Sequence, residues 1–158
     1  MWKERIGEML PLLGHRNWIL VVDKAFPLQT GEGITTVNTG ENLIDVLQHV
    51  MTGIKATQHL RPVIHIDTEL KYMDKCGCAE VEEFRSSLYD LLSTSQRTEY
   101  MLHDEIINRI NEVSKSFAVL ILKTDTTIPY TSVFIELDCG YWNARQERSL
   151  RTQMEKHA

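Results

Sequence analysis

The feature that most restricts the fold is a continuous apolar run of six residues from Phe117 to Leu122. Its lack of polar alternation and its β-branched residues are typical of a central strand that is covered on both faces. A second apolar run, Trp18 to Val22, also predicts a buried strand. A sheet built from such strands needs apolar layers on both sides.

Amphipathic helices alternate with these strands along the chain. The strongest helical pattern keeps one apolar face over three turns and comprises Leu43, Val46, Leu47, Val50, Met51 and Ile54, with Thr39 as the predicted N-cap. A first helix over 6–13 is expected to be kinked or ended early by Pro11. Further helices are predicted over 81–92, ended by the polar residues 93–96, and over 106–113; further strands are predicted at 34–37, 63–67, 98–101 and 133–137.

This order of strands and helices predicts an α/β fold, a three-layer α/β/α single domain with a mainly parallel sheet. We expect the domain to span residues 1–142. Residues 143–158 form a basic tail with a local net charge of +2, from four basic and two acidic side chains. The tail is expected to be a short helix or a frayed terminus.

The overall charge and the apolar content narrow the classes of partner. A net charge of −5 favours neither nucleic acid nor an anionic membrane surface as a partner. No apolar run is long enough for a signal peptide or a membrane span, so we expect a cytoplasmic protein. The three cysteines, Cys76, Cys78 and Cys139, are an odd number, which indicates reduced thiols without a metal.

Ionisable residues bracket the first predicted strand. His15 precedes it and Asp23 follows it, so the two side chains can share a site only if the chain curls back at one end. Sites in parallel sheets form where strands end. That rule selects Asp23, the segment from His65 to Glu69 and the loop 123–130.

Four segments stand out in order along the chain. The opening motif is Leu13-Gly14-His15, an apolar strand, then Asp23 and Phe26-Pro27. It is followed by the helix beginning Gly40-Glu41-Asn42, the strand from Phe117 to Ile121 and the motif Tyr130-Thr131-Ser132-Val133. Together these segments resemble the ribose pyranase and fucose mutarotase family (RbsD/FucU), and the tail lies outside the resemblance.

The resemblance implies a monosaccharide mutarotase that needs no cofactor and no metal. Its reaction opens and recloses the hemiacetal of a free ribose-like or fucose-like sugar by general acid/base catalysis. By resemblance, His15 and Asp23 are the catalytic residues, and His103, Tyr130, Ser132 and Glu69 bind the substrate. The family assembles as rings, which implies a pentamer or decamer with sugar pockets between subunits.

Two alternatives remain open. Ser132 stands where the family often has asparagine, which favours a sugar-binding relative that has lost the chemistry. His65, Asp67 and Glu69 alternate along one predicted strand, and such a set can converge on Zn²⁺ or Mn²⁺ in a metal-dependent isomerase or hydrolase.

Overall fold

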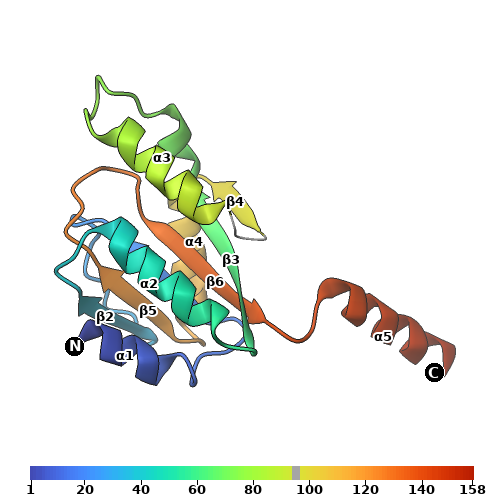
Figure 1. The fold of residues 1–158 in the computed structure, drawn as a ribbon. Helices are drawn as coiled ribbons and strands as arrows, with labels where there is room; N and C mark the ends of the chain where they lie inside the picture. The colour runs from blue at the N-terminus through green and yellow to red at the C-terminus, as the bar shows by residue number, and fades with distance from the viewer. Residues whose placement is uncertain (94–96) are drawn as a thin grey trace.

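A six-stranded sheet with the strand order β2-β5-β1-β6-β3-β4 organises the molecule (Figure 1). The computed structural model describes residues 1–93 and 97–158. Among the described strands, β6 alone runs antiparallel to its neighbours β1 and β3, and the other pairings are parallel. The predicted α/β fold with a mainly parallel sheet is therefore confirmed. The strands are β1 Trp18–Val22, β2 Ile34–Asn38, β3 Leu60–Asp67, β4 Thr98–Met101, β5 Val119–Lys123 and β6 Val133–Cys139.

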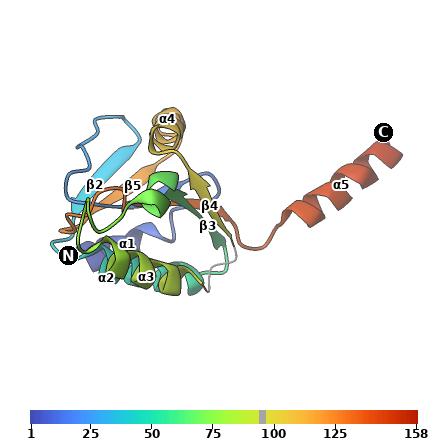
Figure 2. The ribbon, with the colours of Figure 1, turned by 90° about the horizontal axis from the view of Figure 1, so that it is seen from above.

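Helices cover both faces of this sheet (Figure 2). Helices α1 (Trp2–Met9), α2 (Leu43–Lys55) and α3 (Val81–Leu92) pack on one face, and α4 (His103–Val113) packs on the other. A 3₁₀ turn, Thr68–Tyr72, follows β3. The side chains of β1 alternate between the two apolar clusters, and all five of its residues are buried. This explains why its sequence lacks polar alternation.

The apolar face of α2 agrees with the predicted pattern, because all six of its predicted apolar residues are buried. Each such side chain contributes roughly 1.5–3 kcal/mol on leaving water. The predicted N-cap Thr39 is wrong, since the side chain of Asn42 accepts from the amide of Asp45 at 3.0 Å. Gly40, with a φ of +67°, separates Thr39 from the helix, and the Thr39 hydroxyl donates to the carbonyl of Lys123 instead.

Other element ends follow local chemistry. α1 ends at Met9, before Pro11, as the missing proline amide requires. The central strand β5 begins at Val119 instead of Phe117, because the Phe117 amide still donates to Val113 at the end of α4. α3 ends at Leu92, and residues 94–96 of its predicted terminating run lie outside the described residues.

The tail forms a helix, α5 (Ala144–Lys156), that projects away from the sheet (Figures 1 and 2). None of its residues is buried. A capping box fixes its start, since Asn143 and Gln146 each accept from the other's backbone amide. Over residues 1–93 and 97–158, no helix has the length and apolarity to span a membrane.

Candidate functional site

Polar side chains gather where β1, β3 and β4 end. Because these strands are parallel, their carboxyl ends lie at one edge of the sheet, and the start of the antiparallel β6 lies there too. We call the side chains at this edge the carboxyl-edge cluster: Asp23, Asp67, Glu69, His103, Tyr130 and Ser132.

Asp67 and His103 form the centre of the carboxyl-edge cluster. Oδ2 of the buried Asp67 lies 3.0 Å from Nδ1 of His103, whose side chain is 29% exposed. Burial raises the pKa of Asp67 to about 6, against the lowering effect of His103. The negative charges of Glu69 and Asp23 also raise the pKa of Asp67. The Asp67 carboxylate fixes the orientation of the imidazole by engaging Nδ1.

Glu69 and Tyr130 complete the surroundings of His103. The backbone amide of His103 donates to both carboxylate oxygens of Glu69, at 3.0 and 3.2 Å. The ring of Tyr130 meets the imidazole edge-on with centroids 5.7 Å apart. Tyr130 has a φ of +60°, an unfavourable backbone conformation for a residue with a side chain, and such residues are enriched at functional sites.

Asp23 and Ser132 form a second pair in the carboxyl-edge cluster. The Ser132 hydroxyl donates to Oδ1 of Asp23 at 2.7 Å and accepts from its backbone amide at 3.1 Å. Ser132 is buried, so its hydroxyl holds Asp23 in place. The structure thus brings five of the six predicted site residues to one edge of the sheet.

His15, the sixth, lies at the opposite edge of the sheet, at the other end of β1 from Asp23. β1 separates them by five extended residues, roughly 16 Å at the usual rise per residue. The condition for a site shared by His15 and Asp23 within one copy of the chain, a chain that curls back, is therefore not met. A straight strand buried along its whole length places the residues before and after it at opposite edges of the sheet.

The partner of His15 is Asp138, near the end of β6. Nδ1 of His15 lies 3.1 Å from Oδ1 of Asp138, and Nη2 of Arg61 donates to Oδ2 at 2.8 Å. Hydrogen bonds from Arg61 and from the backbone hold the pKa of Asp138 below its usual value, although burial acts to raise it. We call His15, Arg61 and Asp138 the amino-edge cluster. Arg16, beside His15, also has a positive φ, of +77°.

The three residues of the metal alternative do not converge. The buried His65 donates from Nε2 to Glu136 at 3.0 Å, and its Nδ1 lies 3.7 Å from Glu99. Asp67 and Glu69 contact His103 instead. Within residues 1–93 and 97–158, no three His, Cys, Asp or Glu side chains are placed to hold a metal ion. The predicted convergence of His65, Asp67 and Glu69 is wrong. All three cysteines are free thiols.

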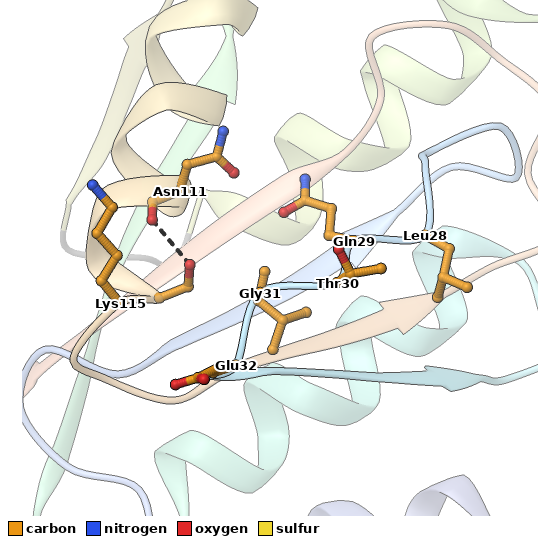
Figure 3. A pocket seen from close by; sticks show the side chains of 9 residues that line it. Leu28, Gln29, Thr30, Gly31, Glu32, Asn111 and Lys115 are labelled. Carbon is orange, nitrogen blue, oxygen red and sulfur yellow. Dashed lines mark hydrogen bonds between the residues drawn. The ribbon is translucent and has the colours of Figure 1, made fainter.

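A cavity of about 630 Å³ lies apart from both clusters (Figure 3). The loop from Leu28 to Glu32 forms one side, and the end of α4 with Asn111 and Lys115 forms the other. The hydroxyl of Ser114 is already bonded to the carbonyl of Asn111. This cavity holds none of the predicted site residues.

The sequence alone assigns no role to Asp138 or Arg61. Asp67 lies in the segment 65–69 that the strand-end rule selects, but its pairing with His103 is not predicted. Asp138 lies in β6, which pairs with β3 so that Asp138 stands opposite Arg61. No local sequence pattern specifies this register.

The architecture is similar to that of solved sugar-binding proteins. RbsD from Bacillus subtilis, solved with D-ribose, superposes with a TM-score of 0.60 at 19% identity, covering 85% of this chain and 91% of that chain. This chain has the RbsD/FucU fold. The fucose mutarotase of Streptococcus pneumoniae, solved with L-fucose, gives a TM-score of 0.58 at 13% identity, covering 83% and 89%.

FucU from Bifidobacterium longum shares the RbsD/FucU fold with a TM-score of 0.52 at 13% identity, covering 85% of this chain and 96% of that chain. No sequence-family model matches the chain, and no curated protein sequence matches it. The likeness therefore lies in the fold.

Proposed function

We propose that this protein is a monosaccharide mutarotase or pyranase, an isomerase that acts on a free ribose-like or fucose-like sugar. The observation that carries the proposal is the Asp67–His103 pair, which lies at the carboxyl edge of an RbsD/FucU fold and leaves the histidine side chain 29% exposed. Histidine exchanges protons near neutral pH, and a buried carboxylate behind it fixes its orientation.

The proposed reaction consists only of proton transfers. A base removes the proton of the anomeric hydroxyl while an acid donates one to the ring oxygen, so the bond between the anomeric carbon and the ring oxygen breaks. The open aldehyde rotates and closes on its other face, or through another hydroxyl, as the protons return. The sugar keeps its atoms and its oxidation state, because each proton that is removed is replaced. General acid/base side chains are therefore sufficient for the reaction.

We assign these roles to the two clusters together. His103 exchanges one proton, and Asp23, Glu69 and Tyr130 bind the sugar hydroxyls. His15 is the second acid or base, and a neighbouring copy of the chain supplies it, because the two clusters lie at opposite edges of one sheet. Subunits joined head to tail bring opposite edges together, and a closed ring such as a pentamer, or a decamer of two rings, results.

A second candidate is a sugar-binding relative without activity. It is favoured by Ser132, whose hydroxyl is engaged by Asp23 and has no amide to offer a sugar. Saturation-transfer NMR on the anomeric protons of D-ribose and L-fucose distinguishes the two candidates. The isomerase accelerates exchange between anomers above the buffer rate, whereas the binding protein broadens the sugar signals without exchange.

Replacement of His103 is the site-specific test. His103→Asn is expected to lower the exchange rate by about 10²–10⁴-fold, the usual contribution of one acid or base. His157→Asn, in the exposed tail, is the matched control and is expected to leave the rate unchanged. Full exchange in a folded His103→Asn variant would contradict the assignment.

A further inference from the structure

A cavity of about 550 Å³ lies where the body of the protein meets the start of α5. His15, Asp138 and Cys139 line it from the edge of the sheet. Trp142, Asn143, Ala144 and Glu147 line it from the segment that leads into α5. Its volume is within the range of small-molecule sites. This side of the cavity therefore comes from Trp142 and from the first residues of the tail, which lies outside the resemblance seen in the sequence.

Hydrogen bonds hold the tail side of this cavity in position. Nη2 of Arg61 donates both to Asp138, at 2.8 Å, and to the carbonyl of Trp142, at 3.3 Å. One guanidinium therefore ties the partner of His15 to the base of the tail. The indole Nε1 of Trp142 donates to Glu147 at 2.9 Å, which orients the ring.

The lining combines an aromatic surface with carboxylates and a histidine. Trp142 is 40% exposed and offers a large apolar surface. Glu147 accepts from Trp142 and from Arg151 at 3.1 Å, and those hydrogen bonds lower its pKa. An ionised carboxylate has about four acceptor sites, so it retains capacity for a hydroxyl. An aromatic face for the C–H side of a sugar ring, next to acceptors for its hydroxyls, suits a monosaccharide.

We propose that Trp142 and Glu147 form a sugar-binding wall for His15, with the indole stacked on the apolar face of the sugar and Glu147 accepting from a hydroxyl. This inference rests on the proposed function and adds Trp142 and the tail residue Glu147 to the substrate site. Trp142 then helps to determine which sugar is bound, since stacking depends on which face of the ring carries the fewest axial hydroxyls.

The test compares Trp142→Ala with Trp142→Phe in the full chain. Both variants lose the indole donor to Glu147, but only the alanine variant loses the aromatic face. We expect Trp142→Ala to raise the KM for D-ribose or L-fucose exchange roughly tenfold, as loss of an aromatic contact does, and Trp142→Phe to stay within roughly threefold. Tyr141→Ala is the control, because Tyr141 is 72% exposed and does not line the cavity.

A second readout separates this inference from the proposed function. Titration with each sugar is expected to shift the NMR signal of the His15 ring in the wild type, and Trp142→Ala is expected to weaken that titration. An unchanged KM and an unchanged titration in a folded Trp142→Ala variant overturn the wall and leave the isomerase standing. A sugar-dependent shift that needs Trp142, without exchange, supports the wall and overturns the isomerase. No shift and no exchange overturn both.

Discussion

The two ends of β1 present opposite kinds of histidine site. At the carboxyl edge, His103 is mostly covered, and its partner Asp67 is fully buried with a raised pKa. At the amino edge, the side chain of His15 is 59% exposed, and its partner Asp138 has a lowered pKa. Both histidines bond a carboxylate through Nδ1 at similar distances, 3.0 and 3.1 Å.

The difference shows how much of a site one copy of the chain can build. One copy of the chain packs the members of the carboxyl-edge cluster between strand ends and a helix. The amino-edge cluster is more open to solvent, with the His15 side chain 59% exposed. A buried site and an open site at opposite edges are the arrangement that a head-to-tail contact would join.

Mixing two inactive variants tests whether the carboxyl edge of one copy meets the amino edge of another. This mixing experiment has the largest expected effect. His15→Asn and His103→Asn should each lower exchange by about 10²–10⁴-fold. Co-expression in mixed assemblies should restore roughly a quarter of the wild-type rate, because one contact in four then joins two intact edges. Anomer exchange by NMR on doubly tagged assemblies is the measurement.

The matched control for subunit mixing combines His15→Asn with Asp138→Asn. Both changes damage the amino edge, so no contact in the mixture has two intact edges and no recovery is expected. Equal activity in both mixtures, or none in either, would contradict a site shared between copies.

The pH dependence of the free energy of unfolding should distinguish the carboxyl-edge cluster, with its buried Asp67, from the amino-edge cluster. Because the folded pKa of Asp67 is raised from 3.8 to about 6, the folded state binds the proton more tightly. The resulting stabilisation is complete below pH 3.8 and is lost as the pH rises through about 6. Asp67→Asn should therefore gain roughly 2–3 kcal/mol over the wild type between pH 4 and pH 8 in urea unfolding.

The control for the pH series is Asp90→Asn, at an exposed position of α3. The difference in the free energy of unfolding between Asp90→Asn and the wild type should be the same at pH 4 and at pH 8. If Asp67→Asn behaves in the same way, burial of the Asp67 carboxylate is not what distinguishes the two clusters.

Replacement of Arg61 should lower the exchange rate by an intermediate amount and should alter the amino-edge cluster alone. Arg61→Ala removes the donor to Asp138 and to the Trp142 carbonyl and should lower exchange roughly tenfold, the size expected for one charged hydrogen bond. The NMR signals of the His15 ring should change, because Asp138 contacts both residues, while those of the His103 ring should not. Arg145→Ala, on exposed α5, serves as the control, and a parallel change in both histidines would contradict the separation of the clusters.

Ser132→Ala should produce the smallest effect. It removes the hydroxyl that holds Asp23, at a cost of about 1 kcal/mol in the free energy of unfolding. Thermal unfolding measures the loss. Substrate binding should weaken only slightly, since Asp67 and His103 do not contact Ser132 through any hydrogen bond recorded among the described residues. A loss as large as that of His103→Asn would assign Ser132 a direct role.

Local patterns were sufficient to predict most of the elements. The strand Trp18–Val22 and the helix Val81–Leu92 were predicted with the bounds that the structure has, because a period of two or of 3.6 residues is visible within one segment. The structure places Asp23, His103, Tyr130 and Ser132 at one edge of the sheet, and their roles stay a prediction. The N-cap of α2 was missed, because Thr39 and Asn42 are both good caps and a glycine conformation decides between them.

By itself, the sequence determined the layered α/β class and the residue types that a proton-transfer site needs. Tertiary structure decided which residues meet. Asp67 lies 36 residues from His103, and Asp138 lies 123 residues from His15, so both pairs depend on strand order and register. Packing of distant strands sets those quantities, and a straight, fully buried β1 decides that His15 and Asp23 lie at opposite edges of one sheet.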